Sequence, residues 1–474
     1  MKKTKIISSI GPASNNYEKF KEMVHNGVNV ARVNFSHATM EERKIVEDLV
    51  KRINKEENRN IGLLFDTKGP EFRSGEVENG EIKLVAGKEI KIVVDKVVGN
   101  TERFSVNHPQ ALRDLKVGDS VLLVNGLIKT EVVSLDNDAD GQFSGVTVKI
   151  LNGGVLGNHK SMAAPGVSLD IPFISEVDKE DITYACNHDG DYLALSFVSS
   201  RDDVLEAREL LKANGREDMK IISKIESVTG IENLDEIIEA SDGIMVARGD
   251  LGVEVPMEML PIYQRMMITK CREAGKFCIV ATEMLVSMKK SIRPTRAEVS
   301  DVANAVFNGT DAVMLSDETT IGNYPAETVK IMAAICENAE KYYDYNKKFN
   351  INWESTVTAS IAESVITASK DLDSKVIVVA TMSGKTARKI SNLKPECPIL
   401  ATVPTEKVAR SLALNYGVYS KVVNEYNSTD EIVTDAVEKA KDFIELDKGD
   451  KIIITGGFPN IGVKTTDFMK IEEI

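Results

Sequence analysis

The chain has 474 residues and a mass of 52.1 kDa, which suggests roughly three domains at about 150 residues each. Hydrophobic residues make up 42% of it and charged residues 28%, an ordinary globular composition that can bury a core. The net charge of −14 argues against nucleic acid as a partner, because a phosphate backbone needs a basic footprint. Small anions are not excluded, since local lysines, arginines or bound cations can hold them.

The sequence also argues against membrane insertion and secretion. It contains no apolar run near the roughly 20 residues that cross a bilayer. The basic N-terminus is followed by only two isoleucines, which is too short for a secretory signal. The five cysteines are scattered and form no CxxC pair, so neither disulfides nor a zinc site is indicated. We therefore expect a cytoplasmic protein with no membrane partner.

Eight short apolar segments, each followed by polar residues, predict the strands of a barrel. In chain order they are 5–7, 28–31, 61–65, 192–195, 220–223, 244–247, 278–281 and 312–315. Most intervals between them have apolar residues at helical spacing, for example 233–240 and 262–274. Alternating strands and helices form parallel βα units, and eight units suggest a (β/α)8 TIM barrel. In that fold the active site lies at the C-terminal ends of the strands, where these polar residues stand.

Two other regions differ from this pattern. Residues 71–164 contain alternating β segments separated by turn sequences, which predicts a small inserted β-barrel domain that would form a lid over the catalytic face. Residues 346–474 contain β segments at 376–380, 398–402, 418–423 and 451–455 with helical segments between them. They predict a C-terminal open α/β domain. The catalytic barrel then comprises residues 1–70 and 165–345.

Lys224 and Glu226 are the first candidates for chemistry. Residues two apart on a strand point to the same side, so both would project into the barrel mouth. Asp250 follows the next strand in Arg248-Gly249-Asp250, and it would share a divalent cation with Glu226, because Mg²⁺ is usually held by two carboxylates and substrate oxygens. The alternatives are a strand-end salt bridge for Lys224 and Glu226 and a helix N-cap for Asp250.

A second polar cluster follows two neighbouring strands. Its members are Arg32, Asn34, Ser36, His37, Asp66 and Thr67. Amide and hydroxyl oxygens with one carboxylate suit a weakly held monovalent cation. The alternative is local capping by Ser36 and a loop hydrogen bond by Asn34. Cations, Mg²⁺ ligands and glycine turns at one barrel mouth together favour phosphoryl transfer, in which positioning and charge neutralisation supply most of the catalysis.

Long matches make the chain resemble the pyruvate kinase family, of the bacterial type, over nearly its whole length. They cover residues 9–14, 29–37, 66–71, 222–226, 241–255 and 293–315. Their length and order are far more specific than a short motif. The resemblance implies the family's barrel, inserted β domain and C-terminal regulatory domain, without the extra phosphohistidine-type domain of some bacterial members. It also implies the glycolytic transfer of the phosphoryl group of phosphoenolpyruvate to ADP, giving pyruvate and ATP.

The resemblance implies roles at matching positions. The expected catalytic residues are Lys224, Arg32, Arg73, Thr282, Ser316 and Glu318. The expected substrate contacts are Arg32, Lys224, Gly249, Asp250 and Thr282, and the expected nucleotide contacts are Pro12, His37 and Lys160. The cofactors would be Mg²⁺ (or Mn²⁺), held by Glu226 and Asp250, and K⁺, held by Asn34, Ser36, Asp66 and Thr67. Glu71 is typical of K⁺-dependent members, so we predict K⁺ activation.

A second site is implied in the C-terminal domain. The family's effector-phosphate loop is matched by Thr381, Ser383, Gly384, Lys385 and Thr386. A glycine turn that opens a helix provides amides for an anion, such as a sugar phosphate or a nucleotide. The alternative is a loop that serves folding only. By family analogy the protein would be a homotetramer.

Three departures from the family pattern leave other readings open. Glu283 replaces a usual Gln, Val286 a Glu and Asp317 a Gly. The two added carboxylates would raise the pKa of the proton relay that contains Ser316 and Glu318, and slow protonation of enolpyruvate. A weakly active or inactive paralogue, acting as a ligand-binding sensor or partner subunit, is therefore an alternative. A third reading is another Mg²⁺-dependent barrel enzyme acting on phosphoenolpyruvate or a 2-oxo acid, which needs neither the nucleotide contacts nor the lid.

Overall fold

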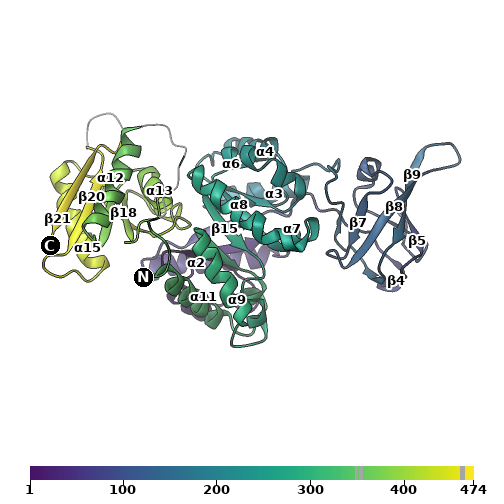
Figure 1. Ribbon diagram of the computed structural model, residues 1–474, viewed down its shortest axis with the longest axis horizontal. Coiled ribbons are helices and arrows are strands. Elements are labelled where there is room, and N and C mark those ends of the chain that lie inside the picture. Colours follow the sequence, from purple (N-terminus) through teal and green to yellow (C-terminus); the bar gives the residue numbers. More distant parts are fainter. Residues whose placement is uncertain (347–350, 352–355, 459–464) are drawn as a thin grey trace.

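The computed structural model of the chain describes residues 1–346, 351, 356–458 and 465–474. Three parts lie in a row, with the barrel between the inserted domain and the C-terminal domain (Figure 1). Residues 347–350, 352–355 and 459–464 of the predicted C-terminal domain lie outside the described residues. Within the described ranges, the structure contains no helix with the length and apolarity needed to span a bilayer.

Eight parallel strands close the barrel in the order β1-β16-β15-β14-β13-β12-β3-β2. They are β1 (Lys5–Ser9), β2 (Val30–Asn34), β3 (Gly62–Asp66), β12 (Tyr192–Leu195), β13 (Lys220–Ile225), β14 (Gly243–Ala247), β15 (Phe277–Ala281) and β16 (Ala312–Leu315). All eight predicted segments overlap these strands, which confirms the predicted TIM barrel. The inserted segment separates β3 from β12, although these two strands are neighbours in the barrel.

Helices surround the barrel. They are α1 (Tyr17–His25), α2 (Met40–Glu56), α3 (Glu176–Asn187), α4 (Arg201–Ala213), α5 (Val228–Glu232), α6 (Leu234–Ala240), α7 (Arg248–Glu254), α8 (Leu260–Glu273), α9 (Arg296–Asn308), α10 (Asp317–Thr320) and α11 (Pro325–Glu340), with 3₁₀ turns η3 (Met257–Met259) and η4 (Val286–Lys289). Capping boxes start α2, α3, α4 and α9, in which a Ser or Thr and an acidic residue three positions later bond each other's backbone amides. The short helices α5, α7 and α10 begin within three residues of their strands and so hold their first residues at the barrel mouth.

Apolar side chains fill both faces of the barrel sheet. Fully buried Ile6, Phe65 and Ile244 belong to the core between the strands and the helices. Ile7 and Leu64 face the other way, into a second core inside the barrel. Because strands of a TIM barrel are buried on both faces, they are short continuous apolar runs rather than alternating ones. This is why the eight segments were visible in the sequence.

The inserted segment forms two sheets around one apolar core. The six-stranded sheet has the order β11-β7-β8-β9-β5-β6, and the two-stranded sheet pairs β10 with β4. The strands are β4 (Glu81–Leu84), β5 (Glu89–Val93), β6 (Arg103–Ser105), β7 (Ser120–Leu123), β8 (Ile128–Asn137), β9 (Phe143–Ile150), β10 (Gly154–Gly157) and β11 (Met162–Ala163), with 3₁₀ turns η1 (Glu78–Gly80) and η2 (Pro109–Asp114). Buried and exposed residues alternate along β4, as expected for a sheet with one wet face.

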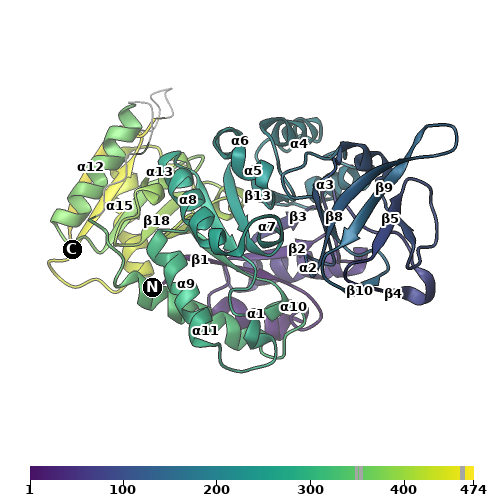
Figure 2. The same ribbon diagram turned by 45° about the vertical axis from the view of Figure 1, so that its right-hand side comes forward.

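The C-terminal part is an open sheet with the order β19-β18-β17-β20-β21. Its elements are α12 (Val357–Asp371), β17 (Val376–Ala380), α13 (Lys385–Asn392), β18 (Ile399–Val403), α14 (Glu406–Arg410), β19 (Val418–Val422), α15 (Thr429–Phe443), β20 (Lys451–Gly456) and β21 (Phe468–Glu473). The four predicted strands are parallel, and β21 is an additional antiparallel edge strand. Figure 2 shows this domain on the side of the barrel away from the inserted domain.

Candidate active site

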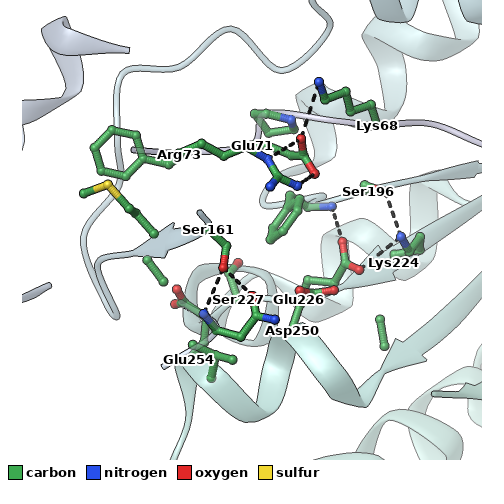
Figure 3. A pocket seen from close by; sticks show the side chains of 18 of the residues that line it. Lys68, Glu71, Arg73, Ser161, Ser196, Lys224, Glu226, Ser227, Asp250 and Glu254 are labelled. Carbon is green, nitrogen blue, oxygen red and sulfur yellow. Dashed lines mark hydrogen bonds and ion pairs between the residues drawn. The ribbon is translucent and has the colours of Figure 1, made fainter. Parts of the chain in front are cut away.

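A pocket of about 620 Å³ lies at the C-terminal ends of the barrel strands, where the inserted domain faces the barrel. The barrel contributes Lys224 and Asp250 to its walls, and the inserted domain contributes Asn125, Lys160 and Ser161. Figure 3 shows Lys224, Glu226 and Asp250 with the Glu71–Arg73 pair across from them. Most of the polar residues predicted at the strand ends therefore line one cavity, whereas Asp66, Thr67, Gly249 and Glu318 lie outside its lining.

Lys224, near the end of β13, is the cation at the floor of this pocket. Its Nζ lies 3.1 Å from Glu226 Oε1 and 3.2 Å from Asp66 Oδ1, and it donates a 2.7 Å hydrogen bond to Ser196 Oγ. Burial alone would lower the pKa of Lys224, but the two carboxylates outweigh burial and raise the pKa above its ordinary value. The ammonium group is therefore charged at neutral pH.

Glu226 and Asp250 provide the two carboxylates of the predicted metal site. Glu226 is 1% exposed and accepts a 2.7 Å hydrogen bond from the Phe197 amide. Burial, together with the nearby charge of Asp250, raises the pKa of Glu226 to about 7 even though Lys224 acts in the opposite direction. A divalent cation would offset the burial and the repulsion by Asp250 that raise this pKa, and two carboxylates are a donor set that Mg²⁺ uses. In the part of the chain that the structure describes, no cluster of three or more His, Cys, Asp or Glu side chains forms a metal site.

The predicted K⁺ cluster lies beside Lys224, at the ends of β2 and β3. Asn34 is the register partner of Asp66 on the neighbouring strand. Asp66 is completely buried and bonds Arg32 Nε at 2.7 Å, and Arg32 in turn donates to Ser9 Oγ. Burial would raise the pKa of Asp66, but Arg32 and Lys224 together hold it below its ordinary value. Asn34 Oδ1 accepts a 3.1 Å hydrogen bond from the Ser36 amide, which is the loop hydrogen bond named as the alternative, and Thr67 Oγ1 accepts one from the Ser196 amide at 3.2 Å. Asn34 and Ser36 line the pocket, whereas Asp66 and Thr67 lie outside its lining.

Arg73 and Glu71 form a two-pronged ion pair where the chain enters the inserted domain. Arg73 donates from Nε at 2.8 Å and from Nη2 at 2.5 Å to the two oxygens of Glu71, and Lys68 lies 3.6 Å away. Burial alone would raise the pKa of Glu71, but its bonds to Arg73 lower it. Arg73 also donates to the His159 carbonyl at 2.9 Å, so it links the two sides of the inserted domain's base.

Thr282 and Gly249 meet at the ends of β15 and β14. The Gly249 amide donates a 2.8 Å hydrogen bond to Thr282 Oγ1, and that hydroxyl donates to the Ala281 carbonyl at 2.6 Å. Thr282 lines the pocket. The two predicted substrate-carboxylate contacts are therefore within one hydrogen bond of each other.

Ser316 and Glu318 follow β16 and are placed differently from each other. Ser316 lines the pocket. Glu318 is 2% exposed and accepts hydrogen bonds from the backbone amides of Leu285 and Ser316 at 3.1 and 2.8 Å. The carboxylate of Glu318 therefore holds two backbone segments together, with its oxygens engaged away from the pocket lining.

The predicted nucleotide and effector residues lie farther out. His37 and Lys160 are exposed and line the pocket, whereas Pro12 is exposed and lies outside the lining. Of the predicted effector residues, Thr381, Ser383 and Gly384 connect β17 to α13 in the C-terminal domain, at the other end of the molecule (Figure 1). Lys385 and Thr386 are the first two residues of α13, and Thr386 is buried. There Gly384 adopts φ +77°, and its amide donates to Thr381 Oγ1 at 3.2 Å.

The three departures from the family pattern are on the surface. Glu283 and Asp317 are exposed, and the side chain of Val286 is 46% exposed. Asp317 Oδ2 forms a 2.8 Å ion pair with Lys289. An exposed, paired carboxylate has a weak effect on a buried neighbour because water screens it.

Sequence reasoning gave no role to three residues that the fold brings to the site. Ser196 accepts the Lys224 hydrogen bond, Arg248 holds the turn of Thr282, and Glu254 lines the pocket. Ser196 and Arg248 follow β12 and β14 directly, so the strand-end rule pointed to both of them. Glu254 is the last residue of α7, and nothing in its sequence context indicated burial.

Comparison with known proteins agrees with this geometry. The family model "Pyruvate kinase, barrel domain" matches residues 1–329, and "Pyruvate kinase, alpha/beta domain" matches residues 359–472. The chain belongs to the pyruvate kinase family. This confirms the resemblance inferred from the sequence.

Individual members of the pyruvate kinase family match along the whole chain. The pyruvate kinase of Clostridium perfringens is 42% identical over 100% of both chains. That of Geobacillus stearothermophilus is 44% identical over 100% of this chain and 80% of its own length. A crystal structure of a pyruvate kinase from Cryptosporidium parvum superposes with a TM-score of 0.94 at 37% identity, covering 100% of this chain and 96% of that one. These matches support an enzyme of the family rather than an inactive relative.

Proposed function

We propose that this chain is an active pyruvate kinase, which transfers the phosphoryl group of phosphoenolpyruvate to ADP and yields pyruvate and ATP. The observation that carries this proposal is the position of the Lys224 ammonium, 3.1 Å from Glu226 Oε1 in the pocket between the barrel and the inserted domain. The pocket combines one lysine, two carboxylates and arginines on its walls. This set suits phosphoryl transfer, because cations and metal-binding carboxylates neutralise the charge on the phosphoryl oxygens.

Lys224 is the catalytic residue of the proposal. Its fixed charge would stabilise the phosphoryl group during transfer and the enolate oxygen that forms as the phosphoryl group leaves. Charges that are already oriented act without reorganisation when the transition state forms. Arg32 and Arg73 would face the phosphoryl group, while the Thr282 hydroxyl and the Gly249 amide would hold the substrate carboxylate.

Glu226 and Asp250 would hold Mg²⁺ (or Mn²⁺), which supplies Lewis-acid charge neutralisation and a template for substrate oxygens when bound. Asn34, Ser36, Asp66 and Thr67 would hold K⁺, and Pro12, His37 and Lys160 would contact the nucleotide. Ser316 would belong to the relay that protonates enolpyruvate. Because Glu318 bonds two backbone amides, we assign it the role of positioning Ser316.

The remaining proposals concern organisation. We divide the chain into a barrel of residues 1–70 and 165–345, an inserted lid of residues 71–164 and a regulatory domain of residues 346–474. The loop with Thr381, Ser383, Gly384, Lys385 and Thr386 would bind a phosphate-bearing effector, either a sugar phosphate or a nucleotide. The enzyme would act in the cytoplasm as a homotetramer.

The first experiment is an assay of pyruvate formation by the purified protein from phosphoenolpyruvate, ADP and Mg²⁺, in matched K⁺ and Na⁺ buffers. We expect turnover that requires Mg²⁺ and is faster in K⁺. No turnover, together with Mg²⁺-dependent binding of phosphoenolpyruvate, would favour the sensor alternative. Turnover at equal rates in the two buffers would overturn K⁺ activation and leave the reaction itself supported.

A further inference from the structure

Arg248 is a buried cation beside the pocket to which the mechanism above gives no role. It is the first residue of α7, and 8% of its surface is exposed. Its guanidinium group donates to the Thr282 carbonyl from Nη2 at 2.6 Å and from Nε at 3.2 Å. Its third nitrogen, Nη1, pairs with Asp301 of α9 at 2.6 Å. One side chain therefore connects the ends of β14 and β15 to a helix behind them.

The backbone that Arg248 holds is strained. Thr282 and Glu283 have φ values of +68° and +54°, in the left-handed region. Such a conformation is uncommon for any residue but glycine, and for a β-branched residue such as threonine it is a genuine outlier. It persists only where surrounding interactions enforce it, and such sites cluster where function requires a fixed geometry. The charged bonds from Arg248 to the Thr282 carbonyl are such an interaction.

The geometry of this turn decides where the Thr282 hydroxyl points. Thr282 Oγ1 accepts a hydrogen bond from the amide of Gly249, the residue that follows Arg248. Arg248 thus fixes Thr282 through its side chain and Gly249 through the peptide bond. It does not line the pocket, whereas Thr282 does.

We propose that Arg248 is a positioning residue for the reaction. It fixes the turn from which the Thr282 hydroxyl, which donates to the Ala281 carbonyl in this structure, would rotate to bind the carboxylate of phosphoenolpyruvate. This inference rests on the proposed function, because it assumes that substrate. The role requires arginine, since its planar fork donates to one carbonyl from two nitrogens while a third pairs with a carboxylate. A lysine would keep the positive charge but could not donate two parallel hydrogen bonds to the Thr282 carbonyl and pair with Asp301 at the same time.

The chain provides a matched control for a merely structural arginine. Arg208 of α4 donates from Nε and Nη2 to the Ala240 carbonyl at 2.9 and 2.7 Å and pairs with Asp242 at 2.9 Å. The two nitrogens hold a carbonyl as in Arg248, but Nη2 also serves Asp242 and the side chain is 33% exposed against 9% for Arg248. Asp242 directly precedes β14, at the opposite end of the barrel from the pocket. Arg208→Lys therefore reports what loss of such a fork does to stability alone.

The experiment compares Arg248→Lys with Arg208→Lys in the full-length protein. For Arg248→Lys we expect kcat/KM for phosphoenolpyruvate to fall about 10²-fold, since misplacement of a contact group by about 1 Å costs that much. We expect the KM for ADP to change less than about twofold, and Arg208→Lys to leave kcat/KM for phosphoenolpyruvate nearly unchanged. The thermal unfolding midpoint is measured for both variants. In a Thr282→Ala background, Arg248→Lys should add little, because residues that act through one another are not additive.

Two measurements keep the inference separate from the proposed function. Calorimetric titration with phosphoenolpyruvate and Mg²⁺ gives the affinity ratio of wild type to Arg248→Lys even if the wild type fails to turn over. Asp301→Asn removes the anchor of the guanidinium at a part-exposed position, and we expect a severalfold loss of phosphoenolpyruvate affinity without unfolding. Additive effects with Thr282→Ala, or an equal weakening of phosphoenolpyruvate and ADP, would overturn the positioning role.

Discussion

The two ends of the barrel hold buried charges in different surroundings. At the mouth, Lys224 is close to both Asp66 and Glu226, with Asp250 nearby, and the group borders an open pocket. At the opposite end two buried cations from the C-terminal domain, Lys394 and Arg410, meet barrel carboxylates. Lys394 pairs with Asp311, and each side chain is 2% exposed.

Side chains of the C-terminal domain also cover part of the bottom of the barrel, beside a cavity of about 450 Å³ that is lined by Lys5, Leu412 and Val418. Arg410 of α14 bonds Asp191 at 3.0 Å, and the Tyr192 hydroxyl donates to the Arg410 carbonyl. Leu414, from the C-terminal domain, belongs to the apolar core inside the barrel. Charges enclosed in this way connect two domains, whereas those at the mouth remain available to a ligand. The comparison teaches that buried ion pairs at the pocket can act on a ligand, whereas those enclosed between the two domains contribute to stability.

The largest expected effect is on stability, at the bottom. Lys394→Met would leave Asp311 buried without its cation, and we expect a loss of about 3–5 kcal/mol in the free energy of unfolding. The measurement is denaturant unfolding, with Lys375→Met as control, since the exposed pair of Lys375 with Asp373 contributes at most about 1 kcal/mol. Adding Asp311→Asn should recover part of the loss. If Lys394→Met were stable but inactive, the pair with Asp311 would act in catalysis, and the proposed difference between the two ends of the barrel would be wrong.

At the mouth of the barrel, we expect loss of the buried lysine to affect activity more than stability. Lys224→Met removes the charge beside the developing oxyanion, and we expect kcat to fall about 10²–10³-fold. The thermal unfolding midpoint should fall less than in Lys394→Met, because Asp66 keeps its bond to Arg32 and Glu226, whose pKa is already raised to about 7, can take up a proton. Pyruvate formation at saturating phosphoenolpyruvate is the measurement. Retention of more than about a tenth of the activity would contradict the proposed role.

Glu254 tests whether a buried carboxylate at the pocket lowers the free energy of unfolding. Burial raises its pKa to about 7 from 4.5, although the Val228 amide donates a hydrogen bond to it. A carboxylate with a raised pKa destabilises the fold fully above pH 7, and this cost disappears as the pH falls toward 4.5. Glu254→Gln should therefore stabilise the protein by about 2 kcal/mol at pH 8 and not at pH 4.5, measured by urea unfolding. The exposed Glu258→Gln is the control, and a gain independent of pH would contradict the assignment.

The smallest effect is expected at the exposed departures from the family pattern. Restoring Glu283→Gln and Asp317→Gly should raise turnover or shift its pH profile, by less than about threefold, because solvent screens both carboxylates. The pH dependence of kcat is the measurement, with Asp373→Gly as a remote surface control. If neither the turnover nor its pH profile changed, Glu283 and Asp317 would have no influence on the proton relay.

The barrel could be predicted because its strands are buried on both faces and are read as short apolar runs. The edge strand β21 could not, because Phe468–Glu473 has no buried residue and gains its structure from pairing with β20. The inserted domain was recognised as β structure from its turns, but its sheet order depends on pairings between distant segments, such as β10 with β4. Register of this kind leaves no local signal in the sequence.

At the site, the sequence by itself determined which residue types stand at the strand ends, and therefore that cations and carboxylates meet at one mouth. Only the tertiary structure decided how they pair. It assigned Asp66 to Arg32 and Lys224, engaged Glu318 with two backbone amides, and placed Arg248 behind the strained turn of Thr282. The physical reason is that strand position is a local property with a period of two residues, whereas partners and burial depend on side chains from other strands and helices.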